Sequence, residues 1–378
     1  MIYLDNAATT QVYPEVLDVM LPYFTEHYGN PAAIYSFAGE SERAVAKARK
    51  QIADVIGAKT EEIYFTGGGS ESDNWALAAT AEAYQAKGNH IITSKIEHHA
   101  VLHTCEYLEK RGFEVTYLDV DENGVIKIDE LKKAIRPTTI LISIMFANNE
   151  IGTIEPVKEI GEIAKEHGII FHTDAVQAFG HVPINVDEYH IDMMSASGHK
   201  LNGPKGIGFL YIKEGTKISP IIFGGGQQKG MRSGTENVPG IVGLAVACEK
   251  MIGKNYENAE KIREVKEYFQ ERIKEIEDIK DNSGKAPHVA SISFKKLRSE
   301  VLLHALEDRE IYVSSGSACS SNKKQAVSGT LNAIALSDEF KDGTLRFSFS
   351  IENTKEEVDE TIKALKELVP MLRRFVRK

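Results

Sequence analysis

The sequence predicts an α/β protein: a large, mainly parallel sheet covered by helices, joined to a smaller α+β domain. Strand-like and helix-like segments alternate between residues 62 and 212, as in repeated β-helix-β units. Residues 140–146 are almost wholly apolar, as expected of a parallel strand buried on both faces. The rest of the chain changes to a long charged amphipathic helix followed by short strands and helices. The large domain is therefore predicted over residues 15–250, and the small one over residues 1–14 and 251–378.

Each element follows from a local pattern. Pro14 suits a first helical turn, and Gly57 and Gly168 are typical C-terminal stops for the helices that precede them. The predicted helices are one from Pro14, then 36–56, 99–110, 156–167, 255–280, 299–307 and 354–373. The predicted strands are 62–66, 90–94, 114–118, 140–146, 169–174, 192–197, 206–212, 288–294, 311–313 and 345–349.

Composition excludes several classes of function. The 378 residues are 42% hydrophobic and 26% charged, as in ordinary soluble proteins. A net charge of −10 argues against a nucleic-acid binder, which would carry a basic face. Neither a signal peptide nor an apolar run of ~18 residues is present, so no membrane partner is expected. Three widely spaced cysteines form neither a disulfide framework nor a metal cluster, which predicts a cytoplasmic protein.

An acid and an amine are predicted at one edge of the sheet. Asp174 ends one strand, and Lys200 follows another in Ser197-Gly198-His199-Lys200. Ligands of open α/β sheets bind outside the carboxyl ends of the strands. A lysine that forms a Schiff base and a carboxylate that keeps a ring nitrogen protonated are the requirements of pyridoxal phosphate. Alternatively, Asp174 is a helix N-cap and Lys200 an ordinary surface lysine.

A glycine-rich turn is a candidate anion site. Gly67-Gly68-Gly69-Ser70 lies between a predicted strand and a helix, where free backbone N–H groups favour a phosphate. The simpler interpretation is a tight turn with Ser70 as the helix N-cap.

The three cysteines differ in their surroundings. Cys105 and Cys248 lie in helical apolar patterns, where a small buried thiol is common. Cys319 lies in a serine-rich stretch with cationic neighbours and no apolar period, so it is predicted on an exposed loop. Such a thiol is a candidate nucleophile, and an incidental surface thiol is the alternative.

Two further charged or titratable residues stand out. His98 follows a strand, from where it could stack on a planar ring or act as an acid or base. Arg346 is a charge inside an apolar strand and needs a partner. A substrate carboxylate or a structural salt bridge would serve equally well.

Taken together, these motifs identify a family. The chain resembles the cysteine desulfurases of the NifS/IscS type, which are fold type I pyridoxal phosphate enzymes of aminotransferase class V. The resemblance runs nearly end to end. The matching motifs are Tyr3-Leu4-Asp5-Asn6-Ala7-Ala8-Thr9-Thr10, Gly29-Asn30-Pro31, Gly69-Ser70-Glu71-Ser72-Asp73-Asn74, Glu97-His98, Asn148-Asn149-Glu150-Ile151-Gly152, His172-Thr173-Asp174-Ala175-Val176-Gln177, Ser197-Gly198-His199-Lys200, Gly224-Gly225-Gly226-Gln227, Arg232-Ser233-Gly234-Thr235 and Ser315-Gly316-Ser317-Ala318-Cys319.

The resemblance implies a role for each site residue. Lys200 would carry pyridoxal phosphate, Asp174 would pair with its ring nitrogen, and His98 would stack on the ring. Asn149 and Gln177 would contact the ring hydroxyl. The phosphate would be held by Gly69, Ser70, Ser197 and His199, and by Thr235 from the neighbouring subunit of a homodimer. Arg346, with Asn149, would bind L-cysteine. Cys319 would attack the substrate sulfur, leaving a persulfide and L-alanine.

The same resemblance implies partners and leaves alternatives. The serine-rich setting of Cys319, in the loop 314–330, is similar to the subgroup that passes sulfur to iron-sulfur scaffold or tRNA-thiolation proteins. No resident metal is expected, although Cys319 is a candidate transient iron-sulfur ligand. The chain departs from the family after Cys319, where a usual histidine is missing and residues 322–325 are unusually cationic. A selenocysteine lyase, another class V aminotransferase or lyase, and an adaptor that has lost its chemistry are the alternatives.

Overall fold

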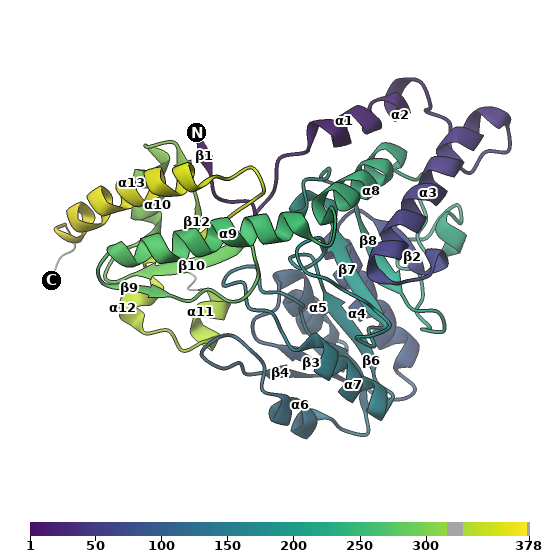
Figure 1. Ribbon diagram of the computed structural model, residues 1–378. Helices are drawn as coiled ribbons and strands as arrows, with labels where there is room; N and C mark the ends of the chain where they lie inside the picture. The colour runs from purple at the N-terminus through teal and green to yellow at the C-terminus, as the bar shows by residue number, and fades with distance from the viewer. Residues whose placement is uncertain (316–327, 376–378) are drawn as a thin grey trace.

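A seven-stranded sheet forms the centre of the larger part of the molecule in the computed structural model, which describes residues 1–315 and 328–375 (Figure 1). Its strand order is β2-β8-β7-β6-β5-β3-β4. The strands are β2 (Ile63–Thr66), β3 (His90–Ser94), β4 (Glu114–Leu118), β5 (Thr139–Ser143), β6 (Ile170–Asp174), β7 (Met193–Ser197) and β8 (Gly208–Ile212). All neighbours pair in parallel except at β8, which is antiparallel to both β2 and β7. The predicted α/β class with a mainly parallel sheet is confirmed.

Successive residues of each strand face two different cores. Ile91, Leu141 and Met193 pack in one apolar cluster with residues of α4 and α5. Ile92, Ile142 and Met194 pack in the other, with residues of α3, α7 and α8. This alternation is the two-residue period of a strand, and burial on both faces explains why apolar residues occur on both faces of the central strands.

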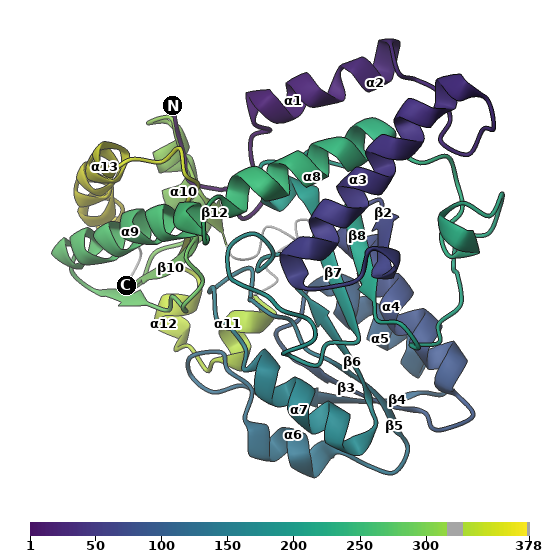
Figure 2. The ribbon, with the colours of Figure 1, turned by 45° about the vertical axis from the view of Figure 1, so that its right-hand side comes forward.

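Helices cover both faces of this sheet. They are α3 (Gly39–Ile56), α4 (Gly69–Tyr84), α5 (His99–Glu109), α6 (Ile128–Ala134), α7 (Val157–His167) and α8 (Val238–Ile252). The short helices α1 (Pro14–Met20) and α2 (Pro22–Thr25) extend along α8 at the outer edge (Figure 2). Gly57 and Gly168 end α3 and α7 in the left-handed conformation, as predicted from the sequence.

A second, smaller sheet has the order β12-β13-β10-β9. Its strands are β9 (Ile279–Asp281), β10 (Val289–Phe294), β12 (Ser314–Ser315) and β13 (Thr344–Ser348), all antiparallel to their neighbours. The surrounding helices are α9 (Glu257–Arg272), α10 (Ser299–Glu307), α11 (Gly329–Ala333), α12 (Asp338–Lys341) and α13 (Lys355–Arg373). The exact division of the chain into two domains stays a prediction.

The N-terminal segment joins this second part of the molecule. β1 (Ile2–Tyr3) pairs in parallel with β11 (Ile311–Tyr312). The backbone N–H of Ala7 donates to Ser348 Oγ at 2.8 Å, across 341 positions of sequence. Residues 5–10 thereby lie between the two sheets.

The helix predicted over residues 255–280 is wrong at its C-terminal end. It ends at Arg272, and Ile279–Asp281 form β9, which pairs with β10. Asp278 has a φ of 52°, so the chain turns there through a conformation that no helix continues. Pairing with β10 outweighs the helical periodicity of this charged segment.

Candidate active site

A cavity of about 490 Å³ opens at the carboxyl ends of β6 and β7. Ten predicted site residues line it: Gly69, Ser70, His98, Asn149, Asp174, Gln177, Ser197, His199, Lys200 and Arg346. They come from α4, the turn before α5, the loop after β5, the ends of β6 and β7 with the turns that follow them, and β13. The parallel strands β6 and β7 are neighbours whose carboxyl ends lie at one edge of the sheet, and this brings Asp174, Ser197 and Lys200 together.

Asp174 is the last residue of β6 and is 5% exposed. Its Oδ1 accepts a hydrogen bond from the Val176 backbone N–H at 2.9 Å. The residues that follow form turns and no helix, so the interpretation of Asp174 as a helix N-cap is wrong. Burial raises the pKa of its carboxyl, while the nearby His98 and Lys200 lower it. A cation brought to this carboxylate would therefore favour its ionised form.

Lys200 ends a short 3₁₀ turn, Gly198–Lys200, directly after β7. Its Nζ donates to the carbonyl oxygens of Ala7 and Ala8 at 2.7 and 2.8 Å. The N-terminal segment thus holds the amine at the cavity, which Asp174 also lines. Lys200 is not an ordinary surface lysine.

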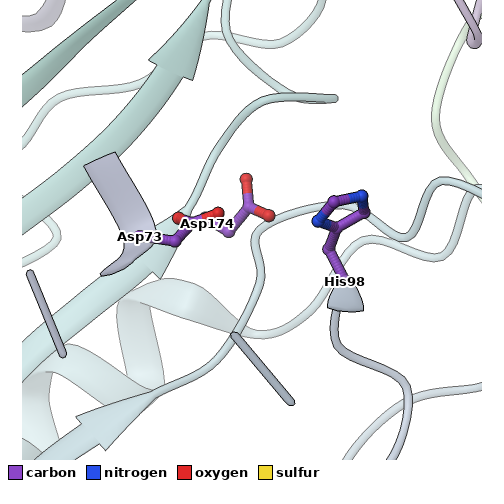
Figure 3. A group of neighbouring side chains, drawn as sticks. All are labelled: Asp73, His98 and Asp174. Carbon is purple, nitrogen blue, oxygen red and sulfur yellow. The ribbon is translucent and has the colours of Figure 1, made fainter. Parts of the chain in front are cut away.

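His98 lies beside a pair of buried carboxyl groups. One ligand atom from each of Asp73, His98 and Asp174 lies within 4.8 Å of the other two (Figure 3). His98 caps α5, where its Nδ1 accepts from the Ala100 backbone N–H at 3.2 Å. The proton of the neutral imidazole is therefore on Nε2. Burial lowers the pKa of His98, which favours this neutral form.

The N-terminus of α4 forms the other end of the cavity. Gly68, with a φ of 145°, is the N-cap, and the helix begins at Gly69. Ser70 is therefore not the cap, contrary to the simpler interpretation of the sequence. A Cβ on Gly69 would lie 2.6 Å from Val176 Cγ2, so only glycine allows this approach. An adjoining hollow is lined by Gly69, Ser70, Ser197 and His199, whose amides and hydroxyls suit an anion.

Arg346 has the structural salt bridge that was one of its two predicted alternatives. Its Nη2 forms a salt bridge with Asp5 Oδ1 at 2.8 Å, and its Nη1 donates to the Asn149 carbonyl at 2.7 Å. It also lines the cavity, and its buried Nε has no hydrogen-bond partner among the described residues. A structural salt bridge is thus present, and the guanidinium remains accessible to a carboxylate ligand.

Gln177 is oriented by two partners outside the predicted set. Its Nε2 donates to the Ala7 carbonyl at 3.0 Å, and its Oε1 is 2.9 Å from His288 Nε2. The ring of His288 stacks on that of His181 at 3.9 Å between centroids. His181 Nε2 in turn lies 3.2 Å from the Lys200 carbonyl.

Of the predicted residues that the structure describes, one does not line the cavity. Thr235 is exposed and is not among the residues that line it. Cys319 lies outside the described residues. The chain on either side of it does line the cavity, through Ser314 and Ser315 before it and Ser328 to Thr330 after it. Ser328 caps α11, and both Ser328 and Thr330 hydrogen-bond the Glu150 carboxylate.

Several groups of the site were missed by the sequence analysis. They are the Ala7 and Ala8 carbonyls, the Asp5 carboxylate, the buried Asp73, and the His181–His288 pair. The motif containing Asp5 to Ala8 was visible, but backbone carbonyls carry no sequence signal. Asp73 lies in the polar run Ser70-Glu71-Ser72-Asp73-Asn74, where no local pattern marks it as buried.

We expect His172 to make the protein less stable in acid. It is fully buried, with its ring nitrogens 2.9 Å from Ser143 Oγ and 3.0 Å from Ser195 Oγ, and burial lowers its pKa to about 3. The contribution of neutral His172 to the free energy of unfolding is complete above the pKa of histidine in the unfolded chain. This contribution is lost as the pH falls toward the lower pKa of His172 in the folded protein. Each pH unit below ~6.5 should remove roughly 1.4 kcal/mol of unfolding free energy.

Urea unfolding at pH 7 and pH 5 measures this loss. The His172→Gln variant should lose less stability between the two pH values than the wild type. His304→Gln, at an exposed helix position, serves as the control and should behave as the wild type. Equal losses in His172→Gln and wild type would contradict the assignment.

Comparison with known proteins agrees with this geometry. Residues 2–361 match the family described as aminotransferase class-V. The chain is 51% identical to a cysteine desulfurase IscS of Methanosarcina thermophila over 98% of this chain and 93% of the relative.

Solved structures give the same result. The chain superimposes on a NifS-like protein with a TM-score of 0.92, at 38% identity, covering 98% of this chain and 100% of that one. It superimposes on SspA in complex with cysteine with a TM-score of 0.83, at 39% identity, covering 94% and 100% of the two chains. Separately, none of the helices in residues 1–315 and 328–375 has the length and apolar character needed to cross a membrane.

Proposed function

The chain belongs to the aminotransferase class-V family and to the cysteine desulfurases within it, and we propose from this that it releases sulfur from L-cysteine. The products are L-alanine and a persulfide on Cys319. The observation that carries the proposal is the cavity shared by Lys200, Asp174 and Arg346, with the chain that flanks Cys319 on its wall.

The cavity suits pyridoxal phosphate by its shape and donor set. The helix N-terminus at Gly69 and Ser70 suits the phosphate, and the Asp174 carboxylate suits a protonated ring nitrogen. His98 is available to stack on the ring, and Asn149 and Gln177 to bind its hydroxyl. When bound, the cofactor supplies a ring that accepts the electron pair of the substrate α-carbon.

The residues of the chain divide the remaining work. Arg346 binds the substrate carboxylate, with Asn149 beside it. Lys200 would hold the cofactor covalently and would move the α-proton of the substrate. Cys319, as thiolate, forms an S–S bond to the substrate sulfur while the C–S bond breaks. The electron pair of that bond stays with carbon, which then takes up a proton to become alanine.

Incubation with L-cysteine tests the proposal. Alanine and sulfide are measured in the presence of a thiol reductant, and the persulfide is located by peptide mass. Equal amounts of alanine and sulfide, with the extra sulfur on the Cys319 peptide, are expected. A product that retains its sulfur and loses its amino group would identify an aminotransferase. Turnover restricted to selenocysteine would identify a lyase for that substrate.

A homodimer is the proposed assembly, with Thr235 completing the phosphate site of the neighbouring subunit. Large apolar side chains are exposed in two segments: Leu17, Leu21, Phe24, Tyr28, Ile34, Tyr35 and Phe37 in the first, and Ile221 and Phe223 in the second. Exposed apolar patches of this kind are typical of protein interfaces. Thr235 lies in the same loop as Phe223, since the Ser233 backbone N–H donates to the Ile222 carbonyl at 3.2 Å.

Charged substitutions in these segments should split the dimer and weaken cofactor binding. Phe24 is 59% exposed and Phe223 80% exposed, so Phe24→Asp with Phe223→Asp leaves the folded subunit intact. Light scattering should show a monomer, and cofactor affinity should fall at least about tenfold because a phosphate donor is removed. Val301→Asp, 46% exposed on α10, is the matched control. A double variant that remains dimeric would place the interface elsewhere.

The persulfide sulfur is proposed to pass to an acceptor protein of iron-sulfur cluster assembly or tRNA thiolation in the cytoplasm. The serine-rich sequence around Cys319 supports this proposal. Residues 322–325 contain two lysines where the family usually has a different segment, which favours an acceptor with an acidic docking surface.

A further inference from the structure

Asp73 is a buried carboxyl group that the proposed chemistry does not use. It lies on α4, one turn after the glycine-rich N-terminus, and is 1% exposed. Asp174 faces it from the end of β6 and is 5% exposed, with the two carboxyl groups within 4.8 Å of each other. Figure 3 shows Asp73 on the side of Asp174 that is remote from His98.

Two carboxylates this close cannot both be charged in a buried site. Each would lose its hydration, and each would raise the free energy of the other. The pair therefore holds at least one proton near neutral pH, as carboxyl pairs in enzymes do.

The surroundings of the two groups determine which one holds the proton. Asp174 faces the cationic side of the site, with His98 and Lys200 both favouring its charge. Besides Asp174, the neighbours of Asp73 include two neutral groups, Ser195 and His172. The hydrogen bond from Ser195 of β7 lowers the pKa of Asp73 and opposes the larger effect of burial, and His172 Nε2 of β6 is 3.7 Å from Asp73 Oδ1. His172 is itself a neutral donor or acceptor between Ser143 and Ser195.

The hydrogen-bonding of Asp73 also fits a neutral acid. Its Oδ1 is buried and has no hydrogen-bond partner among the described residues. An ionised oxygen in that position would carry a large desolvation cost with nothing to offset it. A neutral carboxyl reduces this cost.

We infer that Asp73 is a positioning residue that stays protonated, so that Asp174 alone carries the charge that faces the ring nitrogen of the cofactor. The identity of that cofactor rests on the proposed function. The protonation of Asp73 is independent of the proposed function. The ionisable groups that face Asp73 are Asp174 and His172 from β6, and Glu97 and His98 from the turn before α5. Burial raises the pKa of Asp73 well above its ordinary value, and the negative charges of Asp174 and Glu97 add to the effect.

The first experiment measures stability in the absence of cofactor. Suppose that a carboxyl group is neutral in the folded protein and ionises in the unfolded chain. Its contribution to the free energy of unfolding is then complete below the unfolded pKa of ~3.9. That contribution is lost as the pH rises toward the folded pKa. Asparagine has no proton to lose. The urea midpoint of Asp73→Asn minus that of the wild type should therefore increase steadily from pH 5 to pH 8.

Glu97 is common to both proteins, so the difference reports the proton that Asp73 shares with Asp174, and the second experiment distinguishes the two carboxyl groups. A difference that stays flat between pH 5 and pH 8 would overturn the inference. Asp73→Ser, which is also uncharged and smaller, should show the same pH-dependent increase if the asparagine variant fails to fold.

The second experiment reads the cofactor itself. Pyridoxal phosphate titrated into Asp73→Asn should bind within about threefold of the wild-type affinity, with an unchanged pH midpoint of its visible absorption band. Asp174→Asn removes the charge and should lower the affinity at least about tenfold, since a buried ion pair is lost. Equal loss in both variants would show that Asp73 acts as a charge. A wild type that binds no cofactor would refute the proposed function, while the stability difference would still test Asp73.

Discussion

Replacing Lys200 with alanine is expected to lower the rate of alanine formation from L-cysteine by at least about 10³-fold. The variant loses the amine that attaches the cofactor and the base that moves the α-proton, and each role contributes separately to the rate. The cofactor absorption band of the variant should also differ, because it cannot arise from a covalent bond to Lys200. The spectrum reports the loss of covalent attachment to the cofactor, and the rate reports the loss of attachment and of the base together.

The same substitution has a structural effect that needs a control. Lys200 Nζ donates to the carbonyls of Ala7 and Ala8, so its removal leaves both oxygens with one donor fewer. Lys200→Gln keeps a donor at this position and should recover stability without recovering activity. Lys217→Ala, an exposed lysine beyond β8, should match the wild type in both measurements. Substantial activity in either Lys200 variant would mean that another base moves the proton.

Replacing Cys319 with serine is expected to lower sulfide and alanine production by roughly 10³-fold or more, as the loss of a nucleophile does. A serine hydroxyl is a much weaker nucleophile toward sulfur than a thiolate. Cofactor binding should be unchanged, because no cofactor role is proposed for Cys319. The visible spectrum on adding L-cysteine should therefore still change in Cys319→Ser, while products fail to accumulate.

The other two cysteines provide matched controls for this result. Cys105 and Cys248 are both buried, and burial raises the pKa of the Cys105 thiol to about 12 and also raises that of Cys248. Neither supplies a thiolate near neutral pH. Cys105→Ala and Cys248→Ala should thus keep the activity at a modest cost in stability. Loss of persulfide in one of these variants, with Cys319 intact, would reassign the nucleophile.

Much of the site could be predicted because its chemistry lies at the ends of neighbouring strands. Asp174 and Lys200 each follow an apolar strand, and a parallel sheet brings such positions to one edge. Gly69 was predictable as part of a strand–glycine–helix transition. The exact cap was not, because Gly68 in an unusual conformation and Ser70 are both plausible N-caps by type.

Other parts of the site depend on contacts that no local pattern encodes. The salt bridge of Arg346 with Asp5 spans 341 positions of sequence. The burial of Asp73 results from the packing of α4 on the sheet, whereas most helical acids are exposed. The end of α9 was missed for the same reason, since the strand Ile279–Asp281 exists only because β10 is beside it.

The N-terminal segment between the two sheets has a consequence for the order of events during protein synthesis. Residues 5–8 leave the ribosome long before their partners Arg346 and Ser348, which follow 341 positions later in the sequence. The large sheet can assemble earlier, since domains generally fold as their chain emerges. Lys200 acquires its Ala7 and Ala8 partners in their final place only when this long loop of chain closes. Cofactor loading should therefore be a late, post-translational event, and truncation before residue 344 should leave a folded sheet that binds the cofactor weakly.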